Sequence, residues 1–391
     1  ELDTPAYAPL RQKDAQYRIT FGRGYAGFRK VRDNIDMEYY LAVLPDQPAE
    51  VRLFTVRNRG NEAVTYRVVP YFQIMLGEEP FDTCGKIKTS VDKSLSAIFF
   101  TNPDNDFYKG WGFVAISLPV EILETVRKRF IGGPERDLTL PFMVEKGRPD
   151  EEQEDDGYRI AALVASLTVP AGGEKTVAII IGQAHSQERA QAIIRNLLQV
   201  STAQEALEKT KHWWSEKLSC LRVETNEPAF DRLVNDWLPY QILVSHLWGR
   251  IGLCQRSGAY GFRDQLQDAL PFLFLFPDIS RKSILIHAQQ QFIEGDVLQW
   301  WHSSWEGKTG WGLRGRASDH HLWLPYIVYH YVKATGDTAI LDEKIAFLES
   351  QPIPPGRNEI FSGHRVSREK ASLYEHCLRA IKFSLKRMGS N

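Results

Sequence analysis

Ser257-Gly-Ala-Tyr-Gly-Phe-Arg-Asp-Gln-Leu-Gln-Asp268 is the stretch around which the second half of the chain is organised. Gly258 and Gly261 permit positive φ or a close approach of the backbone to a ligand. The apolar run that follows begins a helix, which Ser257 or Asp264 is placed to cap. The stretch therefore predicts a glycine-marked turn that leads directly into a helix.

Charged side chains stand at this loop-to-helix junction. Arg263 offers a planar fork of donors and Asp264 a pair of acceptors, a combination that suits neighbouring hydroxyl groups of a sugar. The alternative is an ordinary helix cap, in which Asp264 and Asp268 form an acidic pair four residues apart and one of the two simply faces solvent. The rest of the chain is needed to choose between the two.

Composition excludes several classes of protein. The 391 residues are 43% hydrophobic and carry 48 basic against 49 acidic side chains, so no overall field attracts nucleic acid or an anionic membrane. Four cysteines without paired spacing fit reduced thiols rather than a disulfide frame or a zinc site. No apolar run approaches the roughly 18 residues needed to cross a bilayer, and we expect no signal peptide.

The first part of the chain has the period-two pattern of β-strands. Examples are 51–57 and 64–69, and turn residues separate such segments. A hairpin is predicted between 163–169 and 177–181, across the turn Pro170-Ala-Gly-Gly173. The acidic run 150–156 is interpreted as a solvated loop rather than a metal site. The pattern predicts an antiparallel β-sandwich over 1–184.

Helical spacing replaces this pattern in the second part. A helical pair over 185–224 is predicted to link two domains. A helix over 228–249 follows, with a kink or break at Pro239 and two apolar faces that predict packing between other helices. Further helices are predicted over 279–292, 322–334, 338–349 and 372–388. About six helices over 225–391 are compatible with half of a twelve-helix toroid, although periodicity alone allows other helical arrays.

A long loop is predicted over 294–318, and it carries four tryptophans. A loop has no regular face on which to bury them, whereas flat indole rings suit the C–H faces of pyranose rings. The alternative is a segment folded onto the domain as a small core of its own. The histidines of this region do not have a familiar metal-ligand spacing. The residues concerned are Trp300, Trp301, Trp305, Trp311, His302, His320 and His321.

Arginines are concentrated in the same region of a nearly neutral chain. They can bind an anion such as phosphate through paired hydrogen bonds, or they can balance the carboxylates of Asp264, Asp268 and Asp319. Both interpretations stay open. The arginines are Arg256, Arg263, Arg314 and Arg316.

Several motifs together resemble one family. They are Ser257–Asp268, Gln291-Phe-Ile-Glu-Gly-Asp-Val297, Gln299-Trp-Trp-His302, Ala317-Ser-Asp-His-His-Leu-Trp-Leu-Pro-Tyr326 and Ser372-Leu-Tyr-Glu-His-Cys377. As a set they resemble glycoside hydrolase family 94, and most of all the phosphorylase-type region of cyclic β-1,2-glucan synthases. The likeness covers about residues 225–391, and the preceding strands resemble the family's N-terminal β-sandwich.

The resemblance implies an α+β multidomain fold. Its parts are a β-sandwich over 1–184, a helical linker over 185–224 and the N-terminal half of an (α/α)6 barrel over 225–391. The implied activity is inverting phosphorolysis of β-glucosides, with inorganic phosphate as co-substrate, α-glucose 1-phosphate as product, and neither cofactor nor metal. The substrate expected is a β-1,2-glucan oligosaccharide, or a cyclic β-1,2-glucan in processing.

The resemblance also assigns roles to residues. Arg263 and Asp264 are expected to hold the non-reducing-end glucose, and Arg256 lies near the place of a phosphate-binding arginine. The full set of predicted substrate-binding residues is Arg263, Asp264, Asp268, Trp300, Trp301, His302 and Asp319. The family's general acid is the aspartate of a Gly-Asp-Trp-Asn-Asp-Gly motif, which is expected beyond Asn391. We therefore expect this chain to be an inactive portion of a longer enzyme, an expectation that its start at Glu1 also favours.

Two other functions stay open. An inverting hydrolase on the same fold would need a second carboxylate to activate water and would not depend on phosphate. A carbohydrate-binding protein without catalysis is favoured by the missing acid motif. We expect no nucleic-acid partner and no membrane span within the chain. The family likeness adds a homodimer in the cytoplasm, or in the cytoplasmic region of a larger inner-membrane protein.

Overall fold

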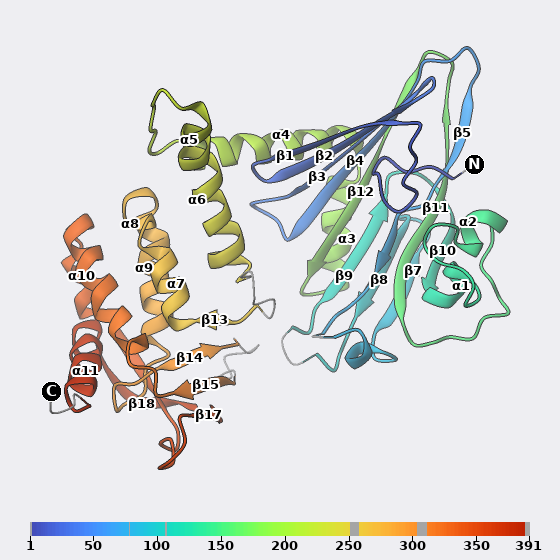
Figure 1. The fold of residues 1–391 in the computed structure, drawn as a ribbon. Helices are drawn as coiled ribbons and strands as arrows, with labels where there is room; N and C mark the ends of the chain where they lie inside the picture. The colour runs from blue at the N-terminus through green and yellow to red at the C-terminus, as the bar shows by residue number, and fades with distance from the viewer. Residues whose placement is uncertain (1, 78, 106–107, 251–257, 303–310, 388–391) are drawn as a thin grey trace. The chain divides into compact units, whose positions relative to one another are not determined.

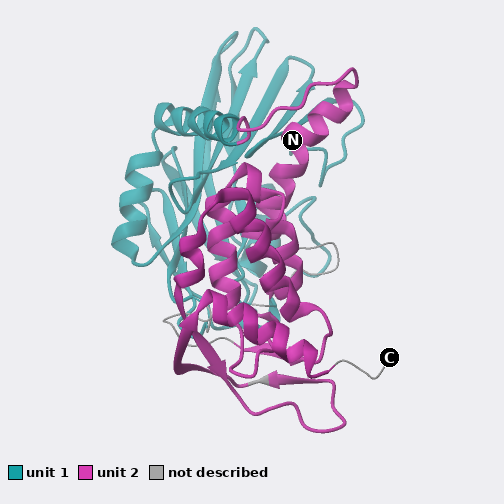
Figure 2. Ribbon diagram, turned by 90° about the vertical axis from the view of Figure 1, so that its left-hand side faces the viewer, with its two compact units in different colours: residues 1–217 teal, residues 218–391 magenta. Residues whose placement is uncertain are grey.

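The computed structural model describes residues 2–77, 79–105, 108–250, 258–302 and 311–387 (Figure 1). These residues form two compact units, Glu1–Lys217 and Leu218–Asn391, which Figure 2 shows in different colours. The first is an antiparallel β-sheet unit and the second is mainly helical, as the sequence predicted. Within the described ranges, no helix has the length and hydropathy required to cross a membrane.

Two antiparallel sheets make up most of the sheet unit. The first has eight strands in the order β1-β2-β3-β4-β12-β9-β8-β7, and the second joins β10, β11, β5 and β6. The strands are β1 (Gln16–Gly22), β2 (Tyr25–Arg32), β3 (Ile35–Val43), β4 (Ala49–Asn58), β5 (Val64–Val68), β6 (Tyr71–Gln73), β7 (Lys88–Asp92), β8 (Ala97–Thr101), β9 (Trp111–Ile116), β10 (Val120–Val126), β11 (Arg159–Val169) and β12 (Glu174–Ala184). The helices are η1 (Phe81–Thr83), α1 (Arg127–Ile131), α2 (Phe142–Lys146), α3 (Gln187–Leu197) and α4 (Val200–Lys217).

Period-two alternation explains how these elements form layers. On β12, Val177 and Ile179 face the second sheet, whereas Ala178 and Ile180 face a core that includes apolar residues of α3 and α4. β11 alternates in the same way, because Leu163 faces the first sheet while its neighbours pack with α1 and α2. The layers are therefore helices, sheet, sheet, helices.

The predicted hairpin between 163–169 and 177–181 is wrong. β11 pairs with β10, β5 and β6, whereas β12 pairs with β4 and β9 in the other sheet. The turn Pro170-Ala-Gly-Gly173 therefore crosses from one sheet to the other. Both strands are apolar on both faces, so each is suited to the middle of a sheet and neither has to pair with its neighbour in sequence.

The predicted helical pair is present as α3 and α4. Both helices pack on the first sheet and belong to the sheet unit, which ends at Lys217. Their apolar residues, among them Ile193, Leu197 and Leu207, are buried in that core. The proposed division into a domain over 1–184, a linker over 185–224 and a domain over 225–391 stays a prediction.

The helical unit contains short strands as well as helices. The helices are α5 (Pro228–Arg232), the π-helical segment η2 (Leu233–Trp237), α6 (Leu238–Gln241), the π-helical segment η3 (Ile242–Trp248), α7 (Phe262–Ala269), α8 (Phe272–Leu275), α9 (Pro277–Ala288), η5 (His320–Leu322), α10 (Trp323–Thr335), η6 (Thr338–Asp342) and α11 (Leu373–Leu385). One sheet has the order β13 (Tyr260–Gly261), β14 (Leu298–Trp301), β15 (Gly312–Gly315), β17 (Glu359–Ser362); another pairs β16 (Lys344–Glu349) with β18 (Arg365–Ser372).

Two expectations for this unit are corrected. The helix predicted over 338–349 is a 3-10 turn followed by β16, because Ile345 and Phe347 alternate inward at period two. The loop predicted over 294–318 contains strands β14 and β15. β14 and β15 pair with each other within the predicted loop, and β16 pairs with β18. These strands have four to six residues, too few for a period of two to be recognised from the sequence.

The segment 228–248 is less enclosed than predicted. Helical backbone continues through Pro239, the second residue of α6, and π-helical segments flank α6 on both sides. Leu243 is fully buried, but Phe230 and Leu233 stay 50% and 43% exposed. This helix therefore packs on one face, whereas α7, α9, α10 and α11 surround a common core.

Candidate functional site

The head of helix α7 holds the central charged pair. Gly261 is the N-cap, and its N–H donates to Oε1 of Gln265 at 3.2 Å. The predicted cap by Asp264 is wrong, since this carboxylate lies within the first turn and makes no capping bond. Ser257, the other predicted cap, lies outside the described residues. The exposed carboxylate of Asp264 is thus favoured by the helix dipole and available to a ligand.

Arg263 connects two carboxylates that are distant in sequence. Its Nη1 lies 3.3 Å from Oδ2 of Asp319 and its Nε lies 3.6 Å from Oδ1 of Asp264. The side chains stay 44%, 46% and 64% exposed for Arg263, Asp319 and Asp264, so the cluster is open to solvent. Burial opposes ionisation of Asp319, but hydrogen bonds from Arg263 and Trp323 lower its pKa below the ordinary value. The cluster presents ionised acceptors and a donor fork side by side.

Asp268 has a partner that the sequence did not reveal. Its Oδ2 lies 2.7 Å from Nδ1 of His246, which comes from η3, and Nε2 of Gln265 donates to the His246 carbonyl. Burial raises the pKa of Asp268, and the neighbouring charge of Asp264 raises it further. The hydrogen bond from His246 lowers this pKa but does not cancel the other two effects. Because 22 residues separate this histidine from Asp268, no local spacing could have indicated it.

His320 follows Asp319 directly and faces the same cluster. Burial lowers the pKa of its imidazole, which the Asp319 carboxylate partly offsets. Within the described residues, its Nδ1 is buried and lacks a hydrogen-bond partner. The ring is therefore a neutral polar group beside the carboxylates.

The predicted aromatic residues lie on two faces of the sheet β13-β14-β15-β17. Trp301 faces the core with 4% exposure, and its ring stacks on Tyr260 with centroids 5.0 Å apart. Trp300 and His302 face the other side, where their rings lie 5.9 Å apart. Trp301 therefore belongs to the common core of the helical unit rather than to a small core of the loop's own. Trp305 lies outside the described residues.

Gly261 brings Asp264 to the face that carries Trp300. Gly261 on β13 is paired with Trp300 on β14, so a side chain at position 261 would point to the same face of the sheet as the indole of Trp300. A Cβ at Gly261 would lie 2.6 Å from Oδ2 of Asp264. The carboxylate therefore occupies the space that a side chain at position 261 would need, on the sheet face that carries Trp300.

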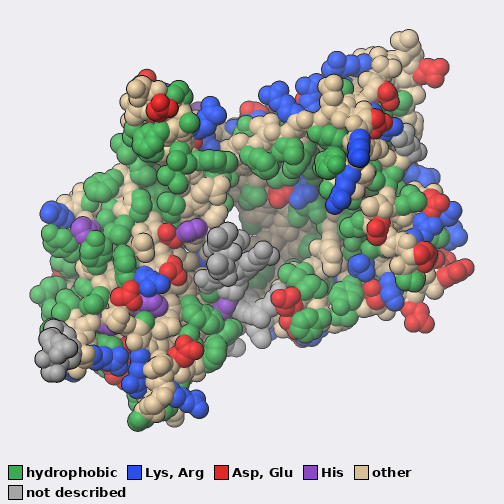
Figure 3. Space-filling model, in the orientation of Figure 1, with side chains coloured by type: hydrophobic (Ala, Val, Ile, Leu, Met, Phe, Trp, Pro, Cys, Tyr) green, Lys and Arg blue, Asp and Glu red, His purple; other side chains and the backbone are tan. Residues whose placement is uncertain are grey.

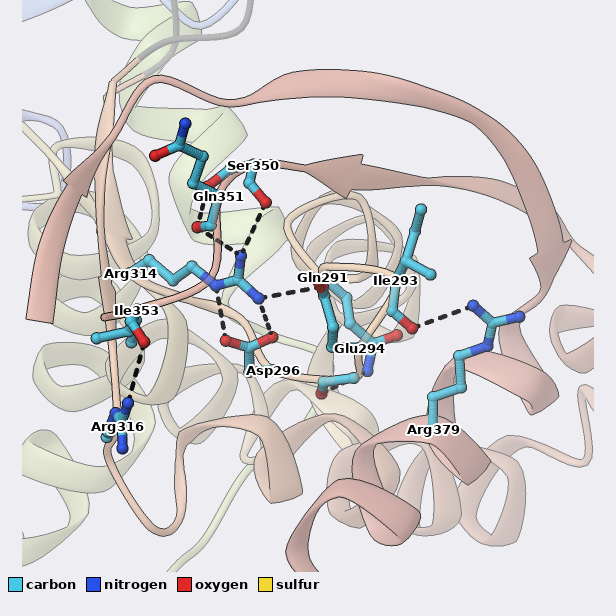
Figure 4. Close-up of polar contacts among 11 residues, drawn as sticks. Gln291, Ile293, Glu294, Asp296, Arg314, Arg316, Ser350, Gln351, Ile353 and Arg379 are labelled. Atoms are coloured by element: carbon cyan, nitrogen blue, oxygen red, sulfur yellow. Dashed lines mark hydrogen bonds and ion pairs between the residues drawn. The ribbon is translucent and has the colours of Figure 1, made fainter. Parts of the chain in front are cut away.

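Arg314 and Arg316 bind partners outside this cluster. Arg314 is 2% exposed, and Figure 4 shows its guanidinium bonded to both oxygens of Asp296, at 2.8 and 2.7 Å, with Glu294 alongside. Arg316 donates to the carbonyls of Ile353 and Pro354. Both hold the chain in place, and the carboxylates that balance Arg314 are not those that we expected. Arg256, the predicted phosphate-binding residue, lies outside the described residues.

Arg250 is a further residue that sequence reasoning missed. Its φ is +50°, a value that side chains other than glycine rarely adopt, and its guanidinium lies 4.4 Å from the ring centroid of Tyr260. Nε also donates to the Gly258 carbonyl at 2.7 Å. Gly258 itself has φ of +68°, as the glycine pattern predicted. Arg250 therefore fixes the turn that leads into α7.

The chemical character of the site follows from these contacts. An exposed carboxylate, an exposed guanidinium and a second carboxylate lie side by side, and the first of them is at the strand residue that pairs with Trp300. Such a surface binds a ring with hydroxyl groups on its edge and C–H groups on its face. Among the described side chains, no group of three histidines, cysteines or acids is arranged to hold a metal ion.

Comparison with known proteins agrees with this character. Residues 1–200 match the supersandwich domain of glycosyl hydrolase 94, and residues 213–391 match the catalytic domain of the glycosyl hydrolase 94 superfamily. A cyclic β-(1,2)-glucan synthase from Rhizobium meliloti is 33% identical over 389 residues. An N,N'-diacetylchitobiose phosphorylase from Vibrio proteolyticus is 23% identical over 411 residues. A solved structure described as a kojibiose phosphorylase from the human microbiome shares the fold, with a TM-score of 0.52 and 10% identity over 82% of this chain.

The chain spans only part of these relatives. It covers 14% of the glucan synthase, 48% of the diacetylchitobiose phosphorylase and 42% of the solved structure, while 99% and 96% of the chain itself align with the first two. Both family domains are matched in the expected order, and together they account for nearly the whole sequence. The chain therefore belongs to glycosyl hydrolase family 94.

Proposed function

We propose that the chain contributes the glucose-binding part of a glycoside phosphorylase that acts on β-1,2-linked gluco-oligosaccharides. The observation that carries the proposal is the head of α7, where Asp264 lies beside Arg263 and occupies the Cβ position of Gly261, the residue that pairs with Trp300. The family supports a phosphorylase, and the glucan synthase relative supports the β-1,2 linkage. The four cysteines show no paired spacing, which is compatible with reduced thiols and a cytoplasmic location.

The proposed reaction is inverting phosphorolysis. A carboxylic acid protonates the glycosidic oxygen while inorganic phosphate attacks the anomeric carbon from the opposite face, which gives α-glucose 1-phosphate. Arg263 and Asp264 hold the non-reducing-end glucose through its hydroxyl groups, and Asp319 fixes the direction of the Arg263 fork. The proposal gives these residues a binding role and leaves proton transfer to another carboxylic acid.

The open cluster also suits an inverting hydrolase or a binding protein without catalysis. A hydrolase needs two carboxyl groups roughly 6.5 to 9.5 Å apart, one of which activates water. Phosphate brings its own charge to the reaction, so arginines take the place of the second carboxylate. Dependence on phosphate therefore separates the two enzymes, and binding without turnover identifies the third possibility.

The first experiment assays the natural protein on β-1,2-gluco-oligosaccharides with and without inorganic phosphate. We expect release of α-glucose 1-phosphate that depends on phosphate. Release of free glucose in the absence of phosphate would instead establish a hydrolase. No turnover combined with measurable binding would establish a binding protein.

The second experiment tests the glucose site by titration calorimetry with sophorose, the β-1,2-linked disaccharide. Asp264→Ala removes a charge-assisted acceptor, so we expect affinity to fall about ten- to a hundredfold. Asp278→Ala is the matched control, because Asp278 is an exposed aspartate in the first turn of α9. Unchanged affinity in Asp264→Ala would sink the assignment.

A further inference from the structure

Four rings form a continuous cluster on the Trp300 face of the sheet. The ring centroid of Trp311 lies 5.2 Å from Trp300, 5.3 Å from His302 and 5.7 Å from Phe361. Phe361 lies 6.0 Å from Trp300. We call these residues, Trp300, His302, Trp311 and Phe361, the aromatic face.

The register of the strands places this cluster in a row that begins at the glucose site. Gly261 pairs with Trp300, Trp300 with Leu313, and Leu313 with Phe361. Directly opposed residues share a face, so the row runs across all four strands from the space occupied by Asp264 to Phe361. Three strand spacings amount to about 14 Å, which is longer than one sugar ring.

The outer part of the aromatic face is open. Leu313 lies beneath it with 7% exposure, whereas Trp311 and Phe361 are 44% and 68% exposed. Figure 3 shows hydrophobic side chains gathered on the surface over strands β14 and β15. A large exposed phenylalanine ring next to a half-exposed tryptophan has an energetic cost in water that binding of a ligand would remove.

The chemistry of the row indicates what covers it. One end carries the acceptors and donors of Asp264 and Arg263, and the other end carries flat apolar rings with a histidine at the edge. A chain of linked pyranose rings has hydroxyl edges and C–H faces along its whole length, so it matches both ends.

We propose that the aromatic face binds the second and later sugar rings of a gluco-oligosaccharide whose terminal ring lies at Arg263 and Asp264. The inference rests on the proposed function for the position of that terminal ring. It adds that the site prefers chains longer than a disaccharide and that Phe361, more than 90 residues from α7 in sequence, determines this preference.

The experiment compares the affinity of the chain for sophorose with its affinity for β-1,2-linked tri-, tetra- and pentasaccharides. We expect affinity to rise with length in the unaltered chain. Phe361→Ala is expected to remove about a three- to tenfold gain for the longer chains, the size of one aromatic contact, and to leave sophorose binding nearly unchanged. Phe361→Tyr retains the ring and is expected to retain the gain. Phe274→Ala on α8 removes another exposed phenylalanine, 77% exposed against 68% for Phe361, and serves as the matched control.

The outcomes separate the two proposals. Equal affinity for all lengths, with Phe361→Ala without effect, overturns the aromatic face as a sugar site. Loss of sophorose binding in Asp264→Ala then still supports the glucose site. If Asp264→Ala has no effect while Phe361→Ala weakens binding of the longer chains, the glucose site fails and the aromatic face stands as a carbohydrate site of its own.

Discussion

Arg314 is a buried charge whose main partner is the buried carboxylate of Asp296, with the more exposed Glu294 as a second partner. Its side chain is 2% exposed and that of Asp296 is 6% exposed, and two parallel hydrogen bonds join them. The ring of Phe292 lies 3.8 Å from the guanidinium carbon, and the carbonyl of Gln351 accepts a further bond. These contacts connect β15 to the segment before β14 and to the chain after β16. The pair therefore stabilises the sheet on which the candidate site is built.

Removal of one member of this pair should destabilise the helical unit strongly. Arg314→Met leaves the Asp296 carboxylate buried without compensation, for which we expect a loss of about 3 to 5 kcal/mol in the free energy of unfolding. Urea unfolding measures it. Arg316→Met is the control, because Arg316 is exposed and bonds only to two carbonyl groups that water can also reach. A loss below 1 kcal/mol in Arg314→Met would contradict the interpretation.

At the scale of single residues, the sequence indicated which charged residues belong to the candidate site better than it indicated which residues they contact. The neighbouring positions of Arg263 and Asp264 are visible in the chain, but Asp319 lies 56 residues away and His246 lies 22 residues before Asp268. Both partners are fixed by tertiary packing around α7. Tertiary packing also decides which arginines of the predicted group can bind a ligand. Arg314 is buried in an ion pair that stabilises the fold, whereas Arg263 stays exposed.

The two-residue strand β13 is the element that aligns polar and aromatic groups. It pairs Gly261 with Trp300 and then leads at once into α7, so the first turn of the helix folds back over the edge of the sheet. The φ of Gly261 is −104°, a value open to any residue, so the glycine is required for space rather than for conformation.

Gly261→Ala should consequently weaken sugar binding and spare the fold. The new methyl group would lie 2.6 Å from the Asp264 carboxylate, which must rotate away because it is the end of a flexible side chain. We expect affinity for sophorose to fall about tenfold, as for loss of one charge-assisted hydrogen bond, with little change in unfolding. Gly363→Ala is the control, since no atom lies within 4 Å of the Cβ position there. Unaltered affinity in Gly261→Ala would show that Asp264 does not depend on this space.

Elements were predictable where the pattern is long and local. The alternating strands of the sheet unit and helices α9, α10 and α11 follow directly from spacing. The pairing of β12 with β4 rather than with β11 cannot be predicted from spacing. β11 and β12 are both apolar on both faces, so their pattern is compatible with a hairpin between them and equally with pairing to other strands. Strands of four residues such as β14 and β15 are too short for period two to be distinguished from a loop.

The two units of the molecule differ in their ionisable core groups. The helical unit buries His287, His321 and His376, and the structure leaves each of them 3% exposed or less. Burial lowers the pKa of all three imidazoles to about 4. The sheet unit has only His185 and His212, both exposed. The absence of histidine from the first 184 residues was visible in the sequence, but whether the others serve a site or a core depended on burial.

This difference predicts that mild acid destabilises the helical unit first. Unfolded histidine binds a proton near pH 6.5, whereas these three stay neutral in the fold until about pH 4, so the unfolded state binds more protons in between. Stability is therefore fully present above pH 6.5 and is lost as the pH falls towards 4, by up to about 1.4 kcal/mol per pH unit for each histidine.

Urea unfolding at pH 7, 6 and 5 measures the slope of the free energy of unfolding against pH. His287→Gln is expected to reduce this slope by the contribution of one proton taken up on unfolding. His185→Gln, at an exposed position of the sheet unit, is the control and should leave the slope unchanged. An unaltered slope in His287→Gln would mean that this imidazole is already protonated in the fold, and its hydrogen bond to the Ser283 carbonyl would then not come from a neutral ring.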